Sequence, residues 1–287
     1  MSFVIDQELC AKCGSCIGNC PNRAIIRRAD EVFVTEMCCD CGICVQYCTM
    51  GAIGKGSVRA EQDTQKLAKA LKEKLSLFKN IAAMQYVDKA PEGVPQEKGP
   101  HFWCGICGDV FDEGGAPVLF SAKASTCGGV ANLGLGAIKA TREEFDSAIN
   151  AQVVGEGNLY ATRDVMSKNR NMFPHFSKVY AGVVIGSLEH MRKPDLVLFP
   201  VNGHQLCMIS TAYAFDTGEL ITGFAGKSTC LMTISTPLMQ NRPVFCAGDH
   251  GGRMFMRLKD DEILVCFPFS LIPGLVKNLD RTVFAQK

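Results

Sequence analysis

Residues 10–25 read CAKCGSCIGNCPNRAI, and residues 38–53 read CCDCGICVQYCTMGAI. Each stretch carries the spacing C-x2-C-x2-C-x3-C, with which cysteine thiolates hold a cubane iron–sulfur cluster. The same order of cysteine, glycine, alanine and isoleucine positions occurs in both, so the region is an internal repeat. Two such runs in tandem predict two [4Fe–4S] clusters close together, and with them one-electron chemistry in a reducing compartment.

The alternative for this repeat is zinc, because C-x2-C pairs also serve zinc sites. Two evenly repeated runs of four cysteines, with Pro21 directly after Cys20, favour clusters over zinc. The second run departs from the first in two ways. Cys48 is followed by Thr49 instead of proline, and Cys39 is an additional cysteine that would break the ligand spacing. We therefore expect Cys39 to be a small bystander residue.

The overall composition excludes several classes of protein. The chain has 287 residues, 47% of them hydrophobic and 21% charged, with a net charge of +1. This near-neutral charge gives no reason to expect a nucleic-acid or anionic membrane partner. No apolar run approaches the roughly 20 residues needed to cross a bilayer, and the first residues lack the pattern of a signal peptide. We therefore expect a soluble cytoplasmic protein and, since such clusters are oxygen-labile, an anaerobic or microaerobic host.

Residues 1–58 resemble the bacterial two-cluster ferredoxin family. Short apolar stretches at residues 2–5 and 31–35 predict strands before each cysteine run, with a short turn or helix beginning after the last cysteine of each run. The resemblance implies crossed ligation, in which each run lends its fourth cysteine to the other cluster. One cluster would then be held by Cys10, Cys13, Cys16 and Cys48, and the other by Cys38, Cys41, Cys44 and Cys20.

The character of the chain changes at about residues 58–62. Residues 62–80 predict an amphipathic helix, with acidic and capping residues at its start and a stripe formed by Leu67, Ala70, Leu71, Leu75 and Phe78. Short apolar runs farther on predict buried strands at residues 81–87, 183–188, 196–201, 243–247 and 263–269. Helical patterns occur at residues 141–151 and 204–217, and residues 88–101 predict a loop. The expected fold class is α+β: a two-cluster ferredoxin-like module at residues 1–58, followed by a larger mixed α/β domain at residues 59–287.

From about residue 62 to its end, the chain resembles the family known as domain of unknown function 169. The resemblance rests on stretches in order, including FWCGIC at residues 102–107, STCGGVANLGLG at 125–136, GFAGKSTCLMTISTPL at 223–238 and CAGDHGGRMFMRLKDDEILVCFPFSLI at 246–272. It implies a fold and a set of recurring positions, not a reaction. Cysteines recur near the positions of Cys104, Cys127, Cys230 and Cys246, whereas Cys107, Cys207 and Cys266 fit that pattern less well.

These four recurring cysteines are candidates for a third metal site. Cys127, Cys230 and Cys246 have small neighbours, and loops with glycine let backbone amides approach a cluster or an anion. For this reason the glycines Gly128, Gly129 and Gly226 are candidate cofactor contacts. The alternative is that the thiols fill a core as small hydrophobic groups. Cys104 and Cys107 also form a C-x-x-C, interpreted first as metal ligands, then as buried thiols, and last as a redox dithiol.

Two nucleotide-binding motifs are incomplete. The sequence GKS at residues 226–228 lacks the glycine that a phosphate loop needs five positions earlier, where Ile221 stands. Residues 134–136 read GLG without a third glycine. The stretch DHGGR at residues 249–253 offers His250 and Arg253 as candidate catalytic residues, since a histidine beside an acid and an arginine could bind a carboxylate or move a proton.

The leading functional hypothesis is an iron–sulfur redox protein, and an oxidoreductase if it has turnover. Its module would relay electrons to or from a cofactor, cluster or small-molecule site in the second domain, because tethering a donor raises its effective concentration. The alternatives are a non-catalytic electron-transfer or docking subunit of a larger oxidoreductase, and an iron–sulfur carrier. The expected partners are a redox protein and a small-molecule substrate. The oligomeric state is open, with a homo-oligomer among the alternatives.

Overall fold

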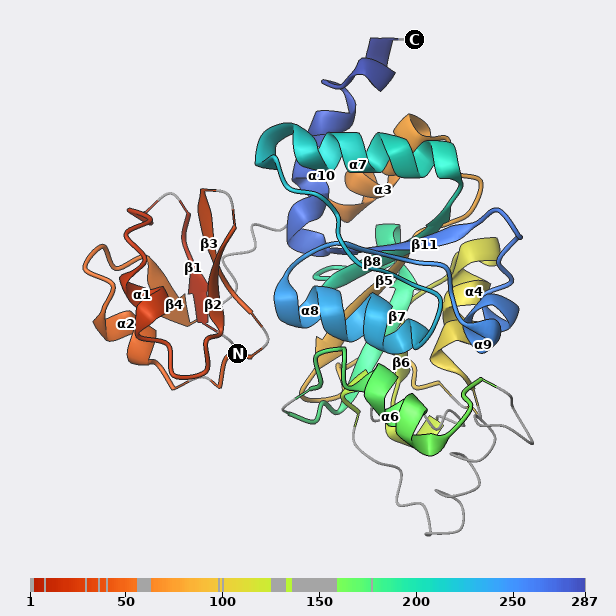
Figure 1. The fold of residues 1–287 in the computed structure, drawn as a ribbon, viewed down its shortest axis with the longest axis horizontal. Helices are drawn as coiled ribbons and strands as arrows, with labels where there is room; N and C mark the ends of the chain where they lie inside the picture. Colours follow the sequence, from red (N-terminus) through yellow and green to blue (C-terminus); the bar gives the residue numbers. More distant parts are fainter. Residues whose placement is uncertain are drawn as a thin grey trace.

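The computed structural model of the chain contains a small N-terminal module and a larger domain built on one sheet (Figure 1). It describes residues 3–7, 9–28, 30–35, 37–39, 41–55, 63–97, 99, 101–124, 133–135, 159–176 and 178–286. The mixed α and β content agrees with the fold class expected from the sequence. Within these described residues, no helix is both long and apolar enough to cross a membrane.

The module consists of two similar halves, and each strand of one half pairs with a strand of the other half. β1 (Phe3–Ile5) runs antiparallel to β4 (Ile53–Lys55), and β2 (Ile25–Arg28) runs antiparallel to β3 (Glu31–Val34). Each pair therefore joins the first half of the repeat to the second. The strands predicted at residues 2–5 and 31–35 are confirmed, each within one or two residues.

A short helix lies inside each cysteine run. α1 (Ser15–Gly18) and α2 (Ile43–Gln46) each contain the third cysteine of their run and are preceded by Gly14 and Gly42. Both glycines adopt φ angles of 81° and 75°, a left-handed conformation that residues with a side chain rarely adopt. The sequence placed any helix after the fourth cysteine. The structure has the helix before it and only a turn after it, because the glycine lets the chain reverse directly after the second ligand.

The first helix of the larger domain is α3 (Thr64–Leu75), where the amphipathic pattern predicted one. The side chain of Asp63 caps it by accepting a hydrogen bond from Lys66 N at 3.0 Å. The predicted apolar stripe is wrong at two positions. Ala68 is buried instead of Ala70, and Phe78 is 94% exposed. The helix ends at Ser76, which adopts a left-handed conformation, so Phe78 lies beyond the helical periodicity that predicted its burial.

The larger domain is organised by a sheet that has seven strands in the described part of the chain. The order is β6-β7-β5-β8-β11-β10-β9, and neighbours are antiparallel except β9 and β10. The strands are β5 (Ala82–Val87), β6 (Val118–Phe120), β7 (Gly182–Ser187), β8 (Leu196–Val201), β9 (Phe224–Ala225), β10 (Val244–Cys246) and β11 (Ile263–Pro268). The five strands predicted from the sequence are confirmed. The helix predicted at residues 141–151 lies outside the described residues.

Both faces of this sheet are buried, which explains why its strands are continuous apolar runs instead of alternating ones. Side chains of β11 alternate between the faces: Leu264 and Cys266 lie on the first face, and Val265 and Phe267 on the second. Helices cover each face, as Figure 1 shows. The first face packs against α4 (Trp103–Glu113) and the helical run of η4 (Leu231–Ser235) and α8 (Thr236–Gln240). The second face packs against α3, α7 (Gly203–Thr217) and α10 (Ile272–Leu279).

The remaining elements are short and peripheral to the sheet. They are η1 (Ala122–Ala124), α6 (Arg163–Arg170), η3 (Leu188–His190), α9 (His250–Phe255), η5 (Phe269–Leu271) and η6 (Val283–Gln286).

Candidate metal centres

Two cavities in the module are each surrounded by four or more cysteines. The first is lined by Cys10, Cys13, Cys16 and Cys48, and the second by Cys20, Cys38, Cys41 and Cys44. In each case three thiols come from one run and the fourth from the other run. These are the two sets that the ferredoxin resemblance implies. Cys39 also lines the second cavity and is exposed.

Each cavity has an inner, buried thiol and an outer, exposed one. Cys16 and Cys44 are buried, whereas Cys13 and Cys41 are exposed. Burial raises the pKa of Cys16 and Cys44, and the neighbouring thiols of the same set raise it further. The hydrogen bond with Ser15 lowers the pKa of Cys13. A ligand must be a thiolate, so four clustered thiols repel one another when charged, and a bound cation offsets that repulsion.

Backbone amides point at the fourth cysteine of each run in the same way. Ala24 N donates to Cys20 Sγ and Ala52 N donates to Cys48 Sγ, both at 3.2 Å. Lys12 N donates to Cys10 Sγ at 3.4 Å. Hydrogen bonds to sulfur stabilise the thiolate and tune the potential of a bound cluster. Ala24 and Ala52 occupy the same position in the two repeats and are both buried, so each holds its backbone donor in place as well as filling space.

The thiols of each set line a cavity, as ligands at the corners of a cubane do.

Cysteines of the larger domain lie in a different environment. Cys104, Cys107, Cys246 and Cys266 are all buried in the apolar core of the first face, and Cys230 packs against it. Burial raises the pKa of Cys246 to about 11 and raises the pKa of Cys107 and Cys266 well above the ordinary value. Such thiols stay protonated at neutral pH. Cys207 is exposed on α7.

The candidate third site is therefore only partly described. The structure brings Cys104 and Cys246 into one core, while Cys127, Gly128 and Gly129 lie outside the described residues. It also places Cys107 and Cys266 there, two residues that the family pattern set aside. The burial of Cys266 in this core could have been predicted from its position two residues after Leu264, which puts both side chains on the same face of β11.

The loop that contains Gly226 lies beside the loop that leads to His250 at the start of α9. They follow the parallel strands β9 and β10, so both leave the same edge of the sheet. Thr229 N donates to Asp249 Oδ2 at 2.9 Å, and Asp249 N donates to Thr229 Oγ1 at 2.7 Å. The other carboxylate oxygen of Asp249 accepts from Gly252 N and caps α9. Asp249 thus ties the two loops together.

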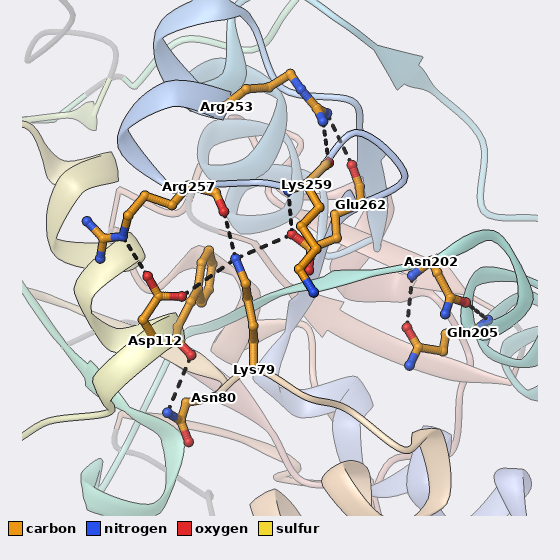
Figure 2. A network of polar contacts seen from close by, with 10 residues as sticks. Lys79, Asn80, Asp112, Asn202, Gln205, Arg253, Arg257, Lys259 and Glu262 are labelled. Atoms are coloured by element: carbon orange, nitrogen blue, oxygen red, sulfur yellow. Dashed lines mark hydrogen bonds and ion pairs between the residues drawn. The ribbon is translucent and has the colours of Figure 1, made fainter.

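The two candidate catalytic residues of this loop differ in their surroundings. His250 is exposed at the start of α9. Arg253 donates to the backbone carbonyls of Lys259 and Glu262, as Figure 2 shows. It also donates to the carbonyl of Ala247, so its guanidinium closes the turn between α9 and β11. This placement gives Arg253 a structural task.

A second network continues from this turn, as Figure 2 shows. Lys79 Nζ donates to the carbonyl of Arg257 at 2.8 Å and lies 3.3 Å from Glu262 and 3.6 Å from Asp112. Arg257 in turn binds Asp109 and Asp112 of α4. The charges are mutually paired and join α4 to the turn before β11. Asn202 and Gln205 form a separate capping box at the start of α7.

The module, with its cavities surrounded by cysteines, defines the class: this is an iron–sulfur protein with a ferredoxin-type electron-transfer module. Residues 3–26 match the 4Fe-4S binding domain family, which supports at least one [4Fe–4S] cluster. Residues 70–278, well over half of the chain, match domain of unknown function 169, described as uncharacterised ArCR, so the chain belongs to that family. Neither the curated proteins nor the solved structures contain a match to it.

Proposed function

We propose that the module holds two [4Fe–4S] clusters and passes electrons singly between an external redox partner and a site associated with the larger domain. The observation that carries this proposal is the pair of cavities, each lined by three cysteines of one run and the fourth of the other. When bound, each cluster would supply a one-electron carrier. The chain's own residues supply the thiolates, the amide donors to sulfur and the apolar walls.

Contacts between the module and the larger domain support an intramolecular relay. Arg28, at the end of β2, lies 2.9 Å from Glu219 beyond α7 and also donates to the carbonyl of Asn241. The side chain of Arg28 is only 14% exposed, so this ion pair is largely removed from water. The burial of Cys16 and Cys44 within the module core supports permanently held clusters over a carrier that gives them away.

Iron and sulfide analysis with EPR on anaerobically purified protein tests the cluster assignment. We expect about eight irons and eight sulfides per chain, from two four-iron clusters. After reduction, the EPR spectrum should show two interacting spins, because the cavities share the walls of one small module. About four irons, or zinc in place of iron, would overturn the assignment of two clusters.

The relay itself depends on the contact between the two parts. Replacing Arg28→Glu should separate the module from the domain, measured as a larger radius of gyration by small-angle scattering. The double variant Arg28→Glu with Glu219→Arg should restore the compact form, because it restores opposite charges. An unchanged radius in the single variant would remove the support that this contact gives to the relay.

A further inference from the structure

A groove of about 690 Å³ lies between the module and the larger domain. From the module it is lined by the β2–β3 hairpin, which Figure 1 shows on the side of the module nearest the sheet domain. From the domain it is lined by the end of α7 and by η5 with α10. Small-molecule sites have volumes of about 300–1,000 Å³ and occur preferentially at domain interfaces.

The hairpin connects this groove to both cysteine cavities. Side chains alternate along a strand, so neighbours point to opposite faces. On β3, Val32 lines the first cavity and Val34 lines the second. Phe33, between them, lines the groove. A molecule in the groove would therefore be separated from both cavities by the thickness of one strand.

The floor of the groove on the domain side is open at Gly274. This glycine lies in the first turn of α10, directly after Pro273, and a Cβ built there would meet nothing within 4 Å. Gly274 therefore leaves open a space that a side chain would fill, beside the apolar Leu271 and Leu275.

Polar groups surround this apolar centre. Arg28, Asp30 and Glu31 lie on the module side, and Tyr213, Asp216 and Asn278 lie on the domain side. Tyr213 Oη donates to Glu219 Oε2 at 2.9 Å, the carboxylate oxygen that also pairs with Arg28. The aromatic ring of Phe33, the open floor at Gly274 and the polar groups around them suit a flat ligand with an apolar face and polar edges.

We propose that this groove binds a planar, conjugated electron acceptor whose ring carries carbonyl oxygens, the chemistry shared by isoalloxazines and quinones. The inference rests on the proposed function, because the groove matters for electron transfer only if the cavities hold clusters. The proposal places the acceptor site of the relay in this groove, which is not lined by the cysteines of the larger domain.

Binding is tested on the full-length, anaerobically purified protein with two probes, riboflavin and menadione, by isothermal titration calorimetry. We expect at least one probe to bind at one per chain. Gly274→Leu, which fills the floor, should weaken that binding at least tenfold. Gly203→Leu is the matched control, since Gly203 is also a helical glycine with open space at its Cβ but lies at the far end of α7. It should bind as the unaltered chain does.

Phe33→Ser is a second variant that removes the aromatic wall and should also weaken binding. Thermal unfolding establishes that each variant is folded. Absence of binding by both probes, or equal binding by the Gly274 and Gly203 variants, would overturn the groove assignment. Iron analysis on the same samples separates the two proposals. About eight irons without binding would reject the groove alone, whereas absence of iron would reject the proposed function.

Discussion

The two regions of this protein use the same residue, cysteine, in opposite ways. In the module the thiols surround small cavities near the surface, and backbone amides of Ala24 and Ala52 donate to them. In the larger domain, Cys107, Cys246 and Cys266 are buried among leucines and valines, where burial raises their pKa. The contrast teaches that surroundings, and not residue type, make a thiol a ligand or a core side chain.

The regions also differ in what holds them together. The core of the module is small, and two of its buried members, Cys16 and Cys44, are themselves candidate ligands. The larger domain has a sheet buried on both faces, with apolar clusters that contain no candidate ligand of the ferredoxin type. In a domain below about 70 residues one hydrophobic core rarely contributes more than about 3–5 kcal/mol, and many small proteins add disulfides or a metal. The module should therefore depend on its clusters, and the domain should not.

The largest expected effect follows from that difference. Removing iron with a chelator, after oxidising the clusters, should unfold the module and leave the larger domain folded. Differential scanning calorimetry should show two transitions before treatment and only the domain's transition afterwards, shifted by no more than about 3 °C, the equivalent of about 1 kcal/mol. A module transition that survives complete iron loss would contradict the idea that clusters hold it.

Exchanging one thiol in each region sharpens the comparison. Cys16→Ala should reduce iron from about eight to about four per chain, because it removes a ligand of one four-iron cluster. Cys266→Ala is the matched change in the larger domain and should leave iron unchanged. Iron analysis with EPR measures both. Loss of iron from the Cys266 variant would show that the core thiols also bind metal.

Stability of the larger domain should depend on its buried apolar contacts. Leu71→Ala, at a fully buried position of α3, should lower the free energy of unfolding by about 3 kcal/mol through lost burial and the cavity left behind. Phe78→Ala, three residues after Leu75 at the end of the helix, should change it by less than about 0.5 kcal/mol because Phe78 is exposed. Urea unfolding of the two variants measures the difference. Similar losses of unfolding free energy in the two variants would mean that Phe78 is buried, as the predicted apolar stripe requires.

The smallest effect is a dependence of domain stability on alkaline pH. The folded state keeps the proton of Cys246 up to a pKa of about 11, whereas the unfolded chain releases it near the ordinary value of 9.0. The unfolded state thus binds fewer protons between pH 9 and 11, and stability falls as the pH rises. Cys246 therefore lowers the unfolding free energy by about 1.4 kcal/mol per pH unit in this range.

Urea unfolding at pH 8, 9 and 10 checks this dependence. The control is Cys246→Ala, which cannot ionise at that position and should show a shallower loss of stability above pH 9. Parallel curves for the two proteins would mean that Cys246 does not keep its proton in the folded state.

Much of the module could be predicted from its sequence, because ligand spacing is a local property. The four cysteines of a run, the glycine at the left-handed turn and the alanine after the fourth ligand lie within 16 residues. In the larger domain, the strands and α3 were also predictable, since continuous apolar runs and helical periodicity are local. Phe78 shows the limit of such reasoning, because a left-handed residue at Ser76 ended the helix before the pattern did.

The sequence by itself determined the cysteine runs and the kinds of element. Only the tertiary structure decided which distant residues meet: the strand order of the sheet, the shared core of Cys104 and Cys266, and the groove between Phe33 and Gly274. The physical reason is that these pairings join residues far apart in the chain. They depend on how two buried faces and two regions pack, which no short stretch of sequence encodes.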